Sequence, residues 1–275
     1  MILNVYKDWG WSSFDVVKKL KSTGQYKKIG HAGTLDPLAE GVLLILTDSD
    51  TKKQPELMAL TKEYLVDVLL GYTSPSYDLG TEVSKTDQAR QVTITDVENA
   101  LPSYIGNINQ RPPLFSAKHI RGTRAYKLAR SNAFSGLSLN ISKVTIYDIT
   151  ACSFLENVSI SYTYSGEDRQ LQGALAKLKV VCGKGTYIRA LARDIGEDLQ
   201  CGGVVTKLVR TKIGEYALEN SLKLEELIEP MRVEVVHDRF VRHLVLVELL
   251  RGARLQSTFN SVAEQVICCG PTPCL

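Results

Sequence analysis

Apolar and polar residues alternate in several stretches of the chain, and in others the apolar residues recur every three or four positions. Alternating or continuously apolar stretches rich in Val, Ile and Leu predict β-strands, whereas the longer period predicts helices. Strands are therefore expected at residues 42–46, 62–71, 144–154, 159–165 and 174–182. Helices are expected at residues 12–21, 51–61, 95–106, 187–199 and 222–230.

The ends of these segments support the assignment. Ser12 can accept a backbone N–H and Asp15 follows three residues later, which is a helix-capping pattern. Pro55 is expected to interrupt the second helix early. Hairpins and helices join the strands without regular βαβ alternation, which predicts an α+β fold with a mixed, largely antiparallel sheet.

Length and composition add the domain organisation. A chain of 275 residues that is 44% hydrophobic can form one large domain, here residues 1–229, with residues 230–275 as a short C-terminal extension. No apolar run is long enough to span a bilayer and the first residues carry no secretory pattern, so we expect a cytoplasmic monomer without membrane association. The six cysteines form no C-x-x-C pair, so no metal site is predicted.

Charge is unevenly distributed although the net charge is only +3. Residues 16–28, "VVKKLKSTGQYKK", contain five lysines and no acid, and residues 111–130 contain six Lys or Arg and no acid. Phe115, Tyr126 and His119 are interleaved in the second segment. Cations neutralise phosphates and flat rings stack on unpaired bases, so nucleic acid is a candidate partner; two solvated basic faces are the alternative.

One carboxylate lies in an unusual loop. In "KKIGHAGTLDPLAEGVLLILT", residues 27–47, Asp36 is followed by a proline that disfavours helical backbone at Asp36. Gly30 and Gly33 permit a tight turn and close approach of another backbone segment. A carboxylate on such a rigid corner can cap a helix, pair with an arginine, or act as a nucleophile or base, and it can also be a simple turn residue.

Several long motifs resemble those of the TruB-type tRNA pseudouridine synthases. The loop motif "GHAGTLDPLAEGVLLI" is similar to the catalytic loop of that family, and "KDWGWSSFDVVKKL" is similar to its N-terminal motif. The segments "KEYLVDVLLGYTSPSYD", "RPPLFSAKHIRGTRAYKLAR" and "VVCGKGTYIRALARDIGEDLQCGGVVTKLVRTKIGEY" follow in the family's order. The resemblance covers roughly residues 1 to 229 and implies a pseudouridine synthase fold with RNA-binding loops.

The resemblance also implies a chemistry. Members isomerise a uridine in the T-loop of tRNA (position 55) to pseudouridine by detaching uracil, turning it and rejoining it through C5, without a cofactor or metal. It implies that Asp36 is the essential carboxylate, through either a nucleophilic or a glycal route. Tyr64 would stack on the flipped uracil and Arg189 would orient Asp36. Arg189 opens a predicted helix, where a cation opposes the helix dipole, so a carboxylate partner is expected.

Substrate binding is implied for further residues. Tyr187 and Leu208 would line the pocket, and His31 would fill the space that the extruded base leaves. In the basic insertion at about residues 111–130, RNA contacts are implied for Lys118, His119, Arg121 and Arg124.

Three other interpretations stay open at this point. A guide-RNA-dependent synthase would usually carry a complete PUA RNA-binding domain, for which residues 230–275 are too short; a reduced or absent PUA-like domain is expected. A tRNA-folding chaperone would use the same surface without needing Asp36. A small-molecule enzyme is disfavoured by the acid-free basic insertion.

Overall fold

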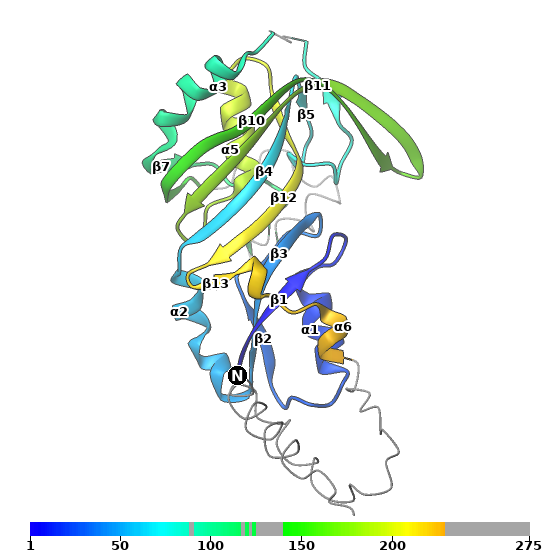
Figure 1. Ribbon diagram of the computed structural model, residues 1–275, viewed down its shortest axis with the longest axis vertical. Coiled ribbons are helices and arrows are strands. Elements are labelled where there is room, and N and C mark those ends of the chain that lie inside the picture. The colour runs from blue at the N-terminus through cyan, green and yellow to red at the C-terminus, as the bar shows by residue number, and fades with distance from the viewer. Residues whose placement is uncertain (88–90, 117–118, 121–122, 125–139, 229–275) are drawn as a thin grey trace, which may run out of the picture. The chain divides into compact units, whose positions relative to one another are not determined.

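The computed structural model describes residues 1–87, 91–116, 119–120, 123–124 and 140–228 of the 275-residue chain. Within these residues one nine-stranded sheet has the order β1-β3-β12-β4-β11-β10-β7, with β2 paired to β3 and β13 paired to β12 (Figure 1). Every pairing is antiparallel except that of β3 with β12. The predicted α+β fold with a mixed, largely antiparallel sheet is confirmed.

The strands are β1 (Ile2–Lys7), β2 (Ile29–Ala32), β3 (Ala39–Thr47), β4 (Lys62–Leu70), β7 (Gly106–Gln110), β10 (Ser142–Tyr164), β11 (Glu167–Cys182), β12 (Gly203–Ile213) and β13 (Tyr216–Ala217).

Short helices and two small ladders accompany the sheet. The α-helices are α1 (Ser13–Lys21), α2 (Gln54–Ala59), α3 (Ile94–Ala100), α5 (Ile188–Asp198) and α6 (Leu224–Ile228). The ladders pair β5 (Tyr72–Thr73) with β6 (Ser84–Lys85) and β8 (His119–Ile120) with β9 (Thr123–Arg124). Short 3₁₀ helices lie at Asp48–Lys53, Leu101–Tyr104 and Leu218–Asn220.

The predicted helix start at Ser12 is confirmed. The backbone N–H of Asp15 donates to Oγ of Ser12 at 3.1 Å, and the backbone N–H of Ser12 donates to Oδ2 of Asp15 at 2.9 Å. The second helix differs from the prediction, because Pro55 lies in the first turn of α2 instead of interrupting it. A missing N–H costs nothing at that position, and the residues before it form the 3₁₀ helix Asp48–Lys53.

The strands predicted at residues 144–154 and 159–165 are one continuous strand, β10. Irregular register between Leu155 and Val158 absorbs the polar residues that had suggested a break. Pairing between β11 and β4 begins at Leu175, so the preceding part of β11 forms a two-stranded arm with β10 (Figure 1). Apolar side chains of the arm, such as Tyr162 and Leu171, pack with Tyr72 of β5 in one hydrophobic cluster.

The core lies on the face of the sheet that α5 and α3 cover. Its largest cluster joins residues of α5, such as Ile188 and Leu191, to Val66, Leu178 and Leu208 on the central strands. A second cluster seats Val16 and Leu20 of α1 against the sheet, and burial of such side chains stabilises each element by roughly 1.5–3 kcal/mol per residue. No helix in the described ranges is long and apolar enough to cross a membrane.

Candidate active site

The Asp36 loop is a tight corner between β2 and β3. The backbone N–H of Ala39 donates to the carbonyl of Asp36 at 3.1 Å, and Gly33 adopts φ +86°, in the left-handed region. The close backbone approach occurs at Gly41 and not at Gly30 or Gly33, where an added Cβ would meet no backbone atom of another segment within 4 Å. A Cβ added at Gly41 would lie 2.3 Å from the carbonyl oxygen of Arg210 on the neighbouring strand.

Two buried cations hold this loop through its backbone. Arg210 donates through Nε to the carbonyl of Val42 at 2.7 Å and through a terminal nitrogen to the carbonyl of Gly33 at 2.9 Å. Lys7, fully buried on β1, donates to the carbonyl of Pro37 at 3.3 Å. Burial lowers the pKa of Lys7 to about 8, although the nearby Asp36 opposes the shift. The loop is therefore fixed on both sides of Asp36.

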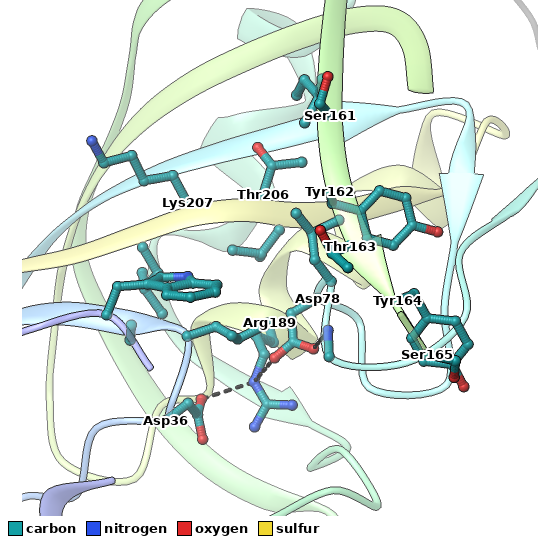
Figure 2. Close-up of a pocket in the computed structure, with 18 residues that line it drawn as sticks. Asp36, Asp78, Ser161, Tyr162, Thr163, Tyr164, Ser165, Arg189, Thr206 and Lys207 are labelled. Carbon is teal, nitrogen blue, oxygen red and sulfur yellow. Dashed lines mark hydrogen bonds and ion pairs between the residues drawn. The ribbon is translucent and has the colours of Figure 1, made fainter. Parts of the chain in front are cut away.

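Arg189, in the first turn of α5, forms the expected ion pair with Asp36. Its Nε lies 2.8 Å from Oδ2 of Asp36 (Figure 2). The Arg189 side chain is only 5% exposed, whereas that of Asp36 is 37% exposed. The arginine therefore forms the buried base of the site, and the carboxylate reaches the solvent side where a substrate can approach it.

Asp78 is a second carboxylate at the same arginine, and it was not among the residues predicted from the sequence. Its Oδ2 lies 3.5 Å from Nε of Arg189, and its Oδ1 accepts a backbone N–H from Gly80 at 2.9 Å (Figure 2). Burial raises the pKa of Asp78, and the ion pair with Arg189 opposes that rise. The segment "YTSPSYDLG" signalled only a loop, because an aspartate among Ser, Pro and Gly is the usual composition of a turn.

The guanidinium of Arg189 is bound along its other edges too. One terminal nitrogen donates to the carbonyl of Ser76 at 2.6 Å, and the other donates to the carbonyl of Phe115 at 2.9 Å. Burial alone would lower the pKa of Arg189, but Asp36 and Asp78 raise it. These contacts offset the unfavourable position of a cation at a helix N-terminus and leave the side chain one orientation.

A pocket of about 700 Å³ opens beside this network. Asp36, Asp78 and Arg189 lie at its base, and Leu208 forms part of its wall, as the resemblance implied. The tip of the β10–β11 arm borders it as well, so segments far apart in the sequence enclose one hollow (Figure 2). The lining comprises Trp9, Asp36, Leu38, Ala39, Asp78, Leu79, Gly80, residues 160–165, Arg189, Val205, Thr206, Lys207 and Leu208.

Three other expected site residues do not line the pocket. Tyr64 is 8% exposed and packs in the same core cluster as Leu208, and burial raises the pKa of its hydroxyl. Tyr187 precedes α5, where Gln110 bonds both its backbone N–H at 2.8 Å and its carbonyl at 3.1 Å. His31 lies on β2 with its Nδ1 buried and without a hydrogen-bond partner in the described part of the chain.

Comparison with known families identifies the chain. The N-terminal domain model of the TruB family of pseudouridylate synthases matches residues 20–188. A tRNA pseudouridylate synthase B C-terminal domain model matches residues 189–247, eighteen residues beyond position 229. The chain belongs to the TruB family of pseudouridylate synthases.

Relatives of this TruB-family enzyme support the assignment over most of its length. A Bacteroides fragilis protein named tRNA pseudouridine synthase B is 39% identical over 245 residues, covering 85% of this chain and 96% of the relative. The protein of that name from Phocaeicola vulgatus is 41% identical over 234 residues, covering 83% and 92%. The one from Clostridium perfringens strain 13 is 37% identical over 232 residues, covering 84% of this chain and 72% of the relative.

Solved structures share the fold. A chain of the Cbf5-Nop10-Gar1 complex superposes with a TM-score of 0.56 at 25% identity, covering 82% of this chain and 53% of that chain. A chain of an H/ACA RNP bound to a substrate RNA containing 2′-deoxyuridine gives a TM-score of 0.54 at 23% identity, with coverages of 82% and 52%. This TruB-family chain therefore spans about half the length of these solved chains.

The start of the basic insertion is anchored to α5. Arg193 donates to the carbonyl of Arg111 at 3.0 Å, in addition to the Arg189 bond to the carbonyl of Phe115. Lys118, Arg121 and the C-terminal extension at residues 230–275 lie outside the described residues. The backbones of His119 and Arg124 pair across the β8–β9 ladder. In the described ranges no group of three or more His, Cys, Asp or Glu is positioned to hold a metal ion.

Proposed function

We propose that this chain isomerises a uridine of tRNA to pseudouridine, and that the uridine is the one at position 55 in the T-loop. Asp36 is the essential carboxylate, Arg189 orients it, and the chain acts as a cytoplasmic monomer on the T-arm. Residues 1–229 form the catalytic domain, and residues 230–275 are a short extension with at most a reduced PUA-like domain. The observation that carries the proposal is the partly exposed Asp36 carboxylate, paired at 2.8 Å with a buried arginine at the base of the pocket.

The reaction conserves atoms, which fits a site of this kind. The N1–C1′ bond of the uridine breaks, the detached uracil turns, and a C5–C1′ bond forms. C5 then loses its proton and N1 gains one, so no electrons are gained or lost. The protein has to hold the detached base, stabilise charge at the sugar and move protons, and these tasks require a carboxylate and a closed pocket.

An ionised, oriented carboxylate serves both routes that the chemistry allows. In the nucleophilic route an oxygen of Asp36 attacks the nucleoside; in the glycal route it removes a proton from the ribose. Arg189 donates to Oδ2 and so fixes the orientation of the carboxylate, and in the described residues no group donates a hydrogen bond to Oδ1. Oδ1 is therefore the oxygen that meets the substrate.

The remaining residues have supporting roles in the proposal. Leu208 borders the uracil at the pocket wall. Tyr64 and Tyr187, which do not line the pocket, are assigned to uracil binding by the family resemblance alone. His31 fills the gap in the stack left by the extruded base, which offsets part of an unstacking cost of a few kcal/mol. Lys118, His119, Arg121 and Arg124 bind the RNA backbone.

The relatives favour a tRNA-modifying synthase over a guide-RNA-dependent synthase. The three proteins named tRNA pseudouridine synthase B are at least 37% identical to this chain over more than 80% of its length. The solved chains in Cbf5 and H/ACA assemblies are more distant, at 23% and 25% identity, and this chain covers about half of each. These differences favour tRNA as the substrate.

Tritium release from an unmodified tRNA transcript labelled at C5 of uridine tests the proposal. Wild-type protein should release tritium stoichiometrically from one uridine, and mapping of the product should place it at position 55. Asp36→Asn should release none while retaining tRNA binding. Release by Asp36→Asn within tenfold of wild type would remove Asp36 from the chemistry, and product at another position would contradict the T-loop assignment.

A further inference from the structure

Exposed aromatic and lysine side chains lie beside the active-site pocket, and none of the roles above uses them. Trp9 borders the pocket and is 63% exposed, and Phe14, in the first turn of α1, is 67% exposed. Phe14, Lys18 and Lys21 are four and three residues apart, a spacing that places them on one face of the helix. Five exposed residues, Trp9, Phe14, Lys18, Lys19 and Lys21, together form what we call the α1 surface.

Lys18 and Lys19 of the α1 surface help to line a shallow hollow of about 450 Å³. Trp9 lines the active-site pocket, and the next two residues, Gly10 and Trp11, line the hollow, so consecutive residues of one turn border both. Its lining residues are Gly10, Trp11, Asp15, Lys18, Lys19 and Ser22.

The helix is attached to the catalytic loop on both sides of Asp36. The hydroxyl of Ser13 donates to the carbonyl of Leu35 at 3.1 Å and accepts the backbone N–H of Leu35 at 2.8 Å. The backbone N–H of Gly10 donates to the carbonyl of Pro37 at 2.8 Å. The α1 surface therefore keeps a fixed position relative to Asp36, as a surface that aligns a substrate must.

The charge of the α1 surface suits a polyanion. All five lysines of residues 16–28 are exposed, and the segment contains no acid. The adjacent Asp15 is engaged by the helix cap, where it accepts the backbone N–H of Ser12 at 2.9 Å and the Ser12 hydroxyl at 2.6 Å. Exposed cations of this kind attract a phosphate chain, and exposed rings beside them supply stacking platforms for unpaired bases.

The border of the pocket formed by the β10–β11 arm is acidic, in contrast to the basic α1 surface. The arm there carries Glu167 and Asp168, and its Arg169 is neutralised by Glu82 at 2.8 Å and by Glu167 at 3.2 Å. Together with Asp78 at the pocket, these acids repel a phosphate chain from the arm side. An RNA strand that enters the pocket is therefore directed past Trp9 and not past the arm.

We propose that the α1 surface binds the RNA strand that flanks the reacting uridine, with Trp9 and Phe14 stacked on unpaired bases and Lys18, Lys19 and Lys21 on phosphates. This inference rests on the proposed function and extends it, because it assigns an RNA contact to a segment outside the basic insertion at residues 111–130. The partner is single-stranded or loop RNA, since a duplex would hide the faces of its bases from the two rings.

Salt-dependent binding tests the lysines. Lys18→Ala with Lys19→Ala is compared with Lys143→Ala with Lys212→Ala, two exposed lysines outside both hollows. All proteins carry Asp36→Asn so that a fluorescent T-arm hairpin stays unconverted, and thermal melts verify folding. The first variant should lower the slope of log K against log salt by roughly 1.4, and the control should leave it unchanged. An unchanged slope in the first variant, or an equal loss in the control, would overturn the proposal.

Photo-crosslinking tests the rings. Phe14 is replaced by p-benzoylphenylalanine, and the control places the same residue at Tyr147, which is 56% exposed on β10. Irradiation should link position 14 to nucleotides within a few positions of the reacting uridine, as mapped by reverse-transcription stops, and position 147 should link weakly or elsewhere. A crosslink from position 14 to a distant part of the hairpin, or none, would contradict the assigned path.

The outcome is separable from that of the proposed function. Tritium release by the wild-type chain is measured first, and its absence would contradict the proposed function alone. Normal release together with an unchanged salt slope and no crosslink at position 14 would contradict only the α1 surface.

Discussion

Arg189 donates through Nε to Oδ2 of Asp36 at 2.8 Å, although 153 positions separate the two residues in the chain. The pair joins the first turn of α5 to the corner between β2 and β3, two segments that the sheet brings together. The same nitrogen faces Asp78 at 3.5 Å, so one buried cation is shared by two carboxylates of unequal exposure. The more exposed carboxylate, Asp36, faces the open side of the site, and the more buried one, Asp78, adds a second negative charge beside the arginine.

Replacing Arg189 by lysine should abolish most turnover. The guanidinium bonds Asp36, the carbonyl of Ser76 and the carbonyl of Phe115 in three directions within one plane, and the single nitrogen of a lysine ammonium cannot reproduce that planar arrangement. We expect kcat for tritium release to fall by roughly a hundredfold or more, about 2.7 kcal/mol of barrier. Near-normal turnover in a folded Arg189→Lys protein would show that Arg189 does not orient Asp36.

Replacing Asp78 by asparagine should slow the reaction without preventing folding. The amide keeps the shape of the carboxylate and can still accept the N–H of Gly80, but it removes the second negative charge at Arg189. Arg189 then pairs with Asp36 alone, and we expect roughly a tenfold loss of kcat. Asp67→Asn is the control, because burial also raises the pKa of Asp67 but that residue does not line the pocket. Equal losses in both variants would rule out a specific role for Asp78.

Replacing Gly41 by alanine should destabilise the corner that carries Asp36. Gly41 has φ +101°, and its new Cβ would lie 2.3 Å from the carbonyl oxygen of Arg210, a backbone atom that cannot turn aside. The cost should be about 2 kcal/mol or more in the free energy of unfolding, measured by urea denaturation. Gly30→Ala is the matched control on β2, where an added Cβ meets nothing within 4 Å. A stability loss no larger than that of the control would contradict the close approach.

The buried Lys7 should make stability depend on pH in the alkaline range. Its folded pKa of about 8 lies below the ordinary lysine pKa of 10.5, so between these pH values the unfolded chain holds one more proton than the folded chain. Stability therefore rises with pH across that window, by at most about 1.4 kcal/mol per unit for one group. The free energy of unfolding of the wild type minus that of Lys7→Met should therefore increase as the pH rises from about 8 to 10.5. A difference that is flat from pH 8 to 10 would mean that Lys7 titrates normally.

Local patterns were sufficient for much of the fold and for the first candidate residue. The Ser12–Asp15 cap, the helix near residues 188–198 and the strands at residues 42–46 and 62–71 follow from side-chain period and capping chemistry, which depend only on near neighbours. Asp36 could be chosen as a candidate site residue because it lies with a proline and glycines in a long loop motif. The position of Arg189 at a helix N-terminus already indicated a carboxylate partner.

The tertiary structure alone decided what surrounds these residues. Asp78 has the local sequence of an ordinary turn residue, and its position at the site depends on β12, α5 and the loop at residues 74–83 meeting in space. Lys7 and Arg210 are charged residues that a pattern assigns to the surface, yet both are buried because backbone carbonyls of the Asp36 loop satisfy them. Contacts across more than a hundred positions depend on strand order and register, and these arise from the packing of the whole sheet and not from any one segment.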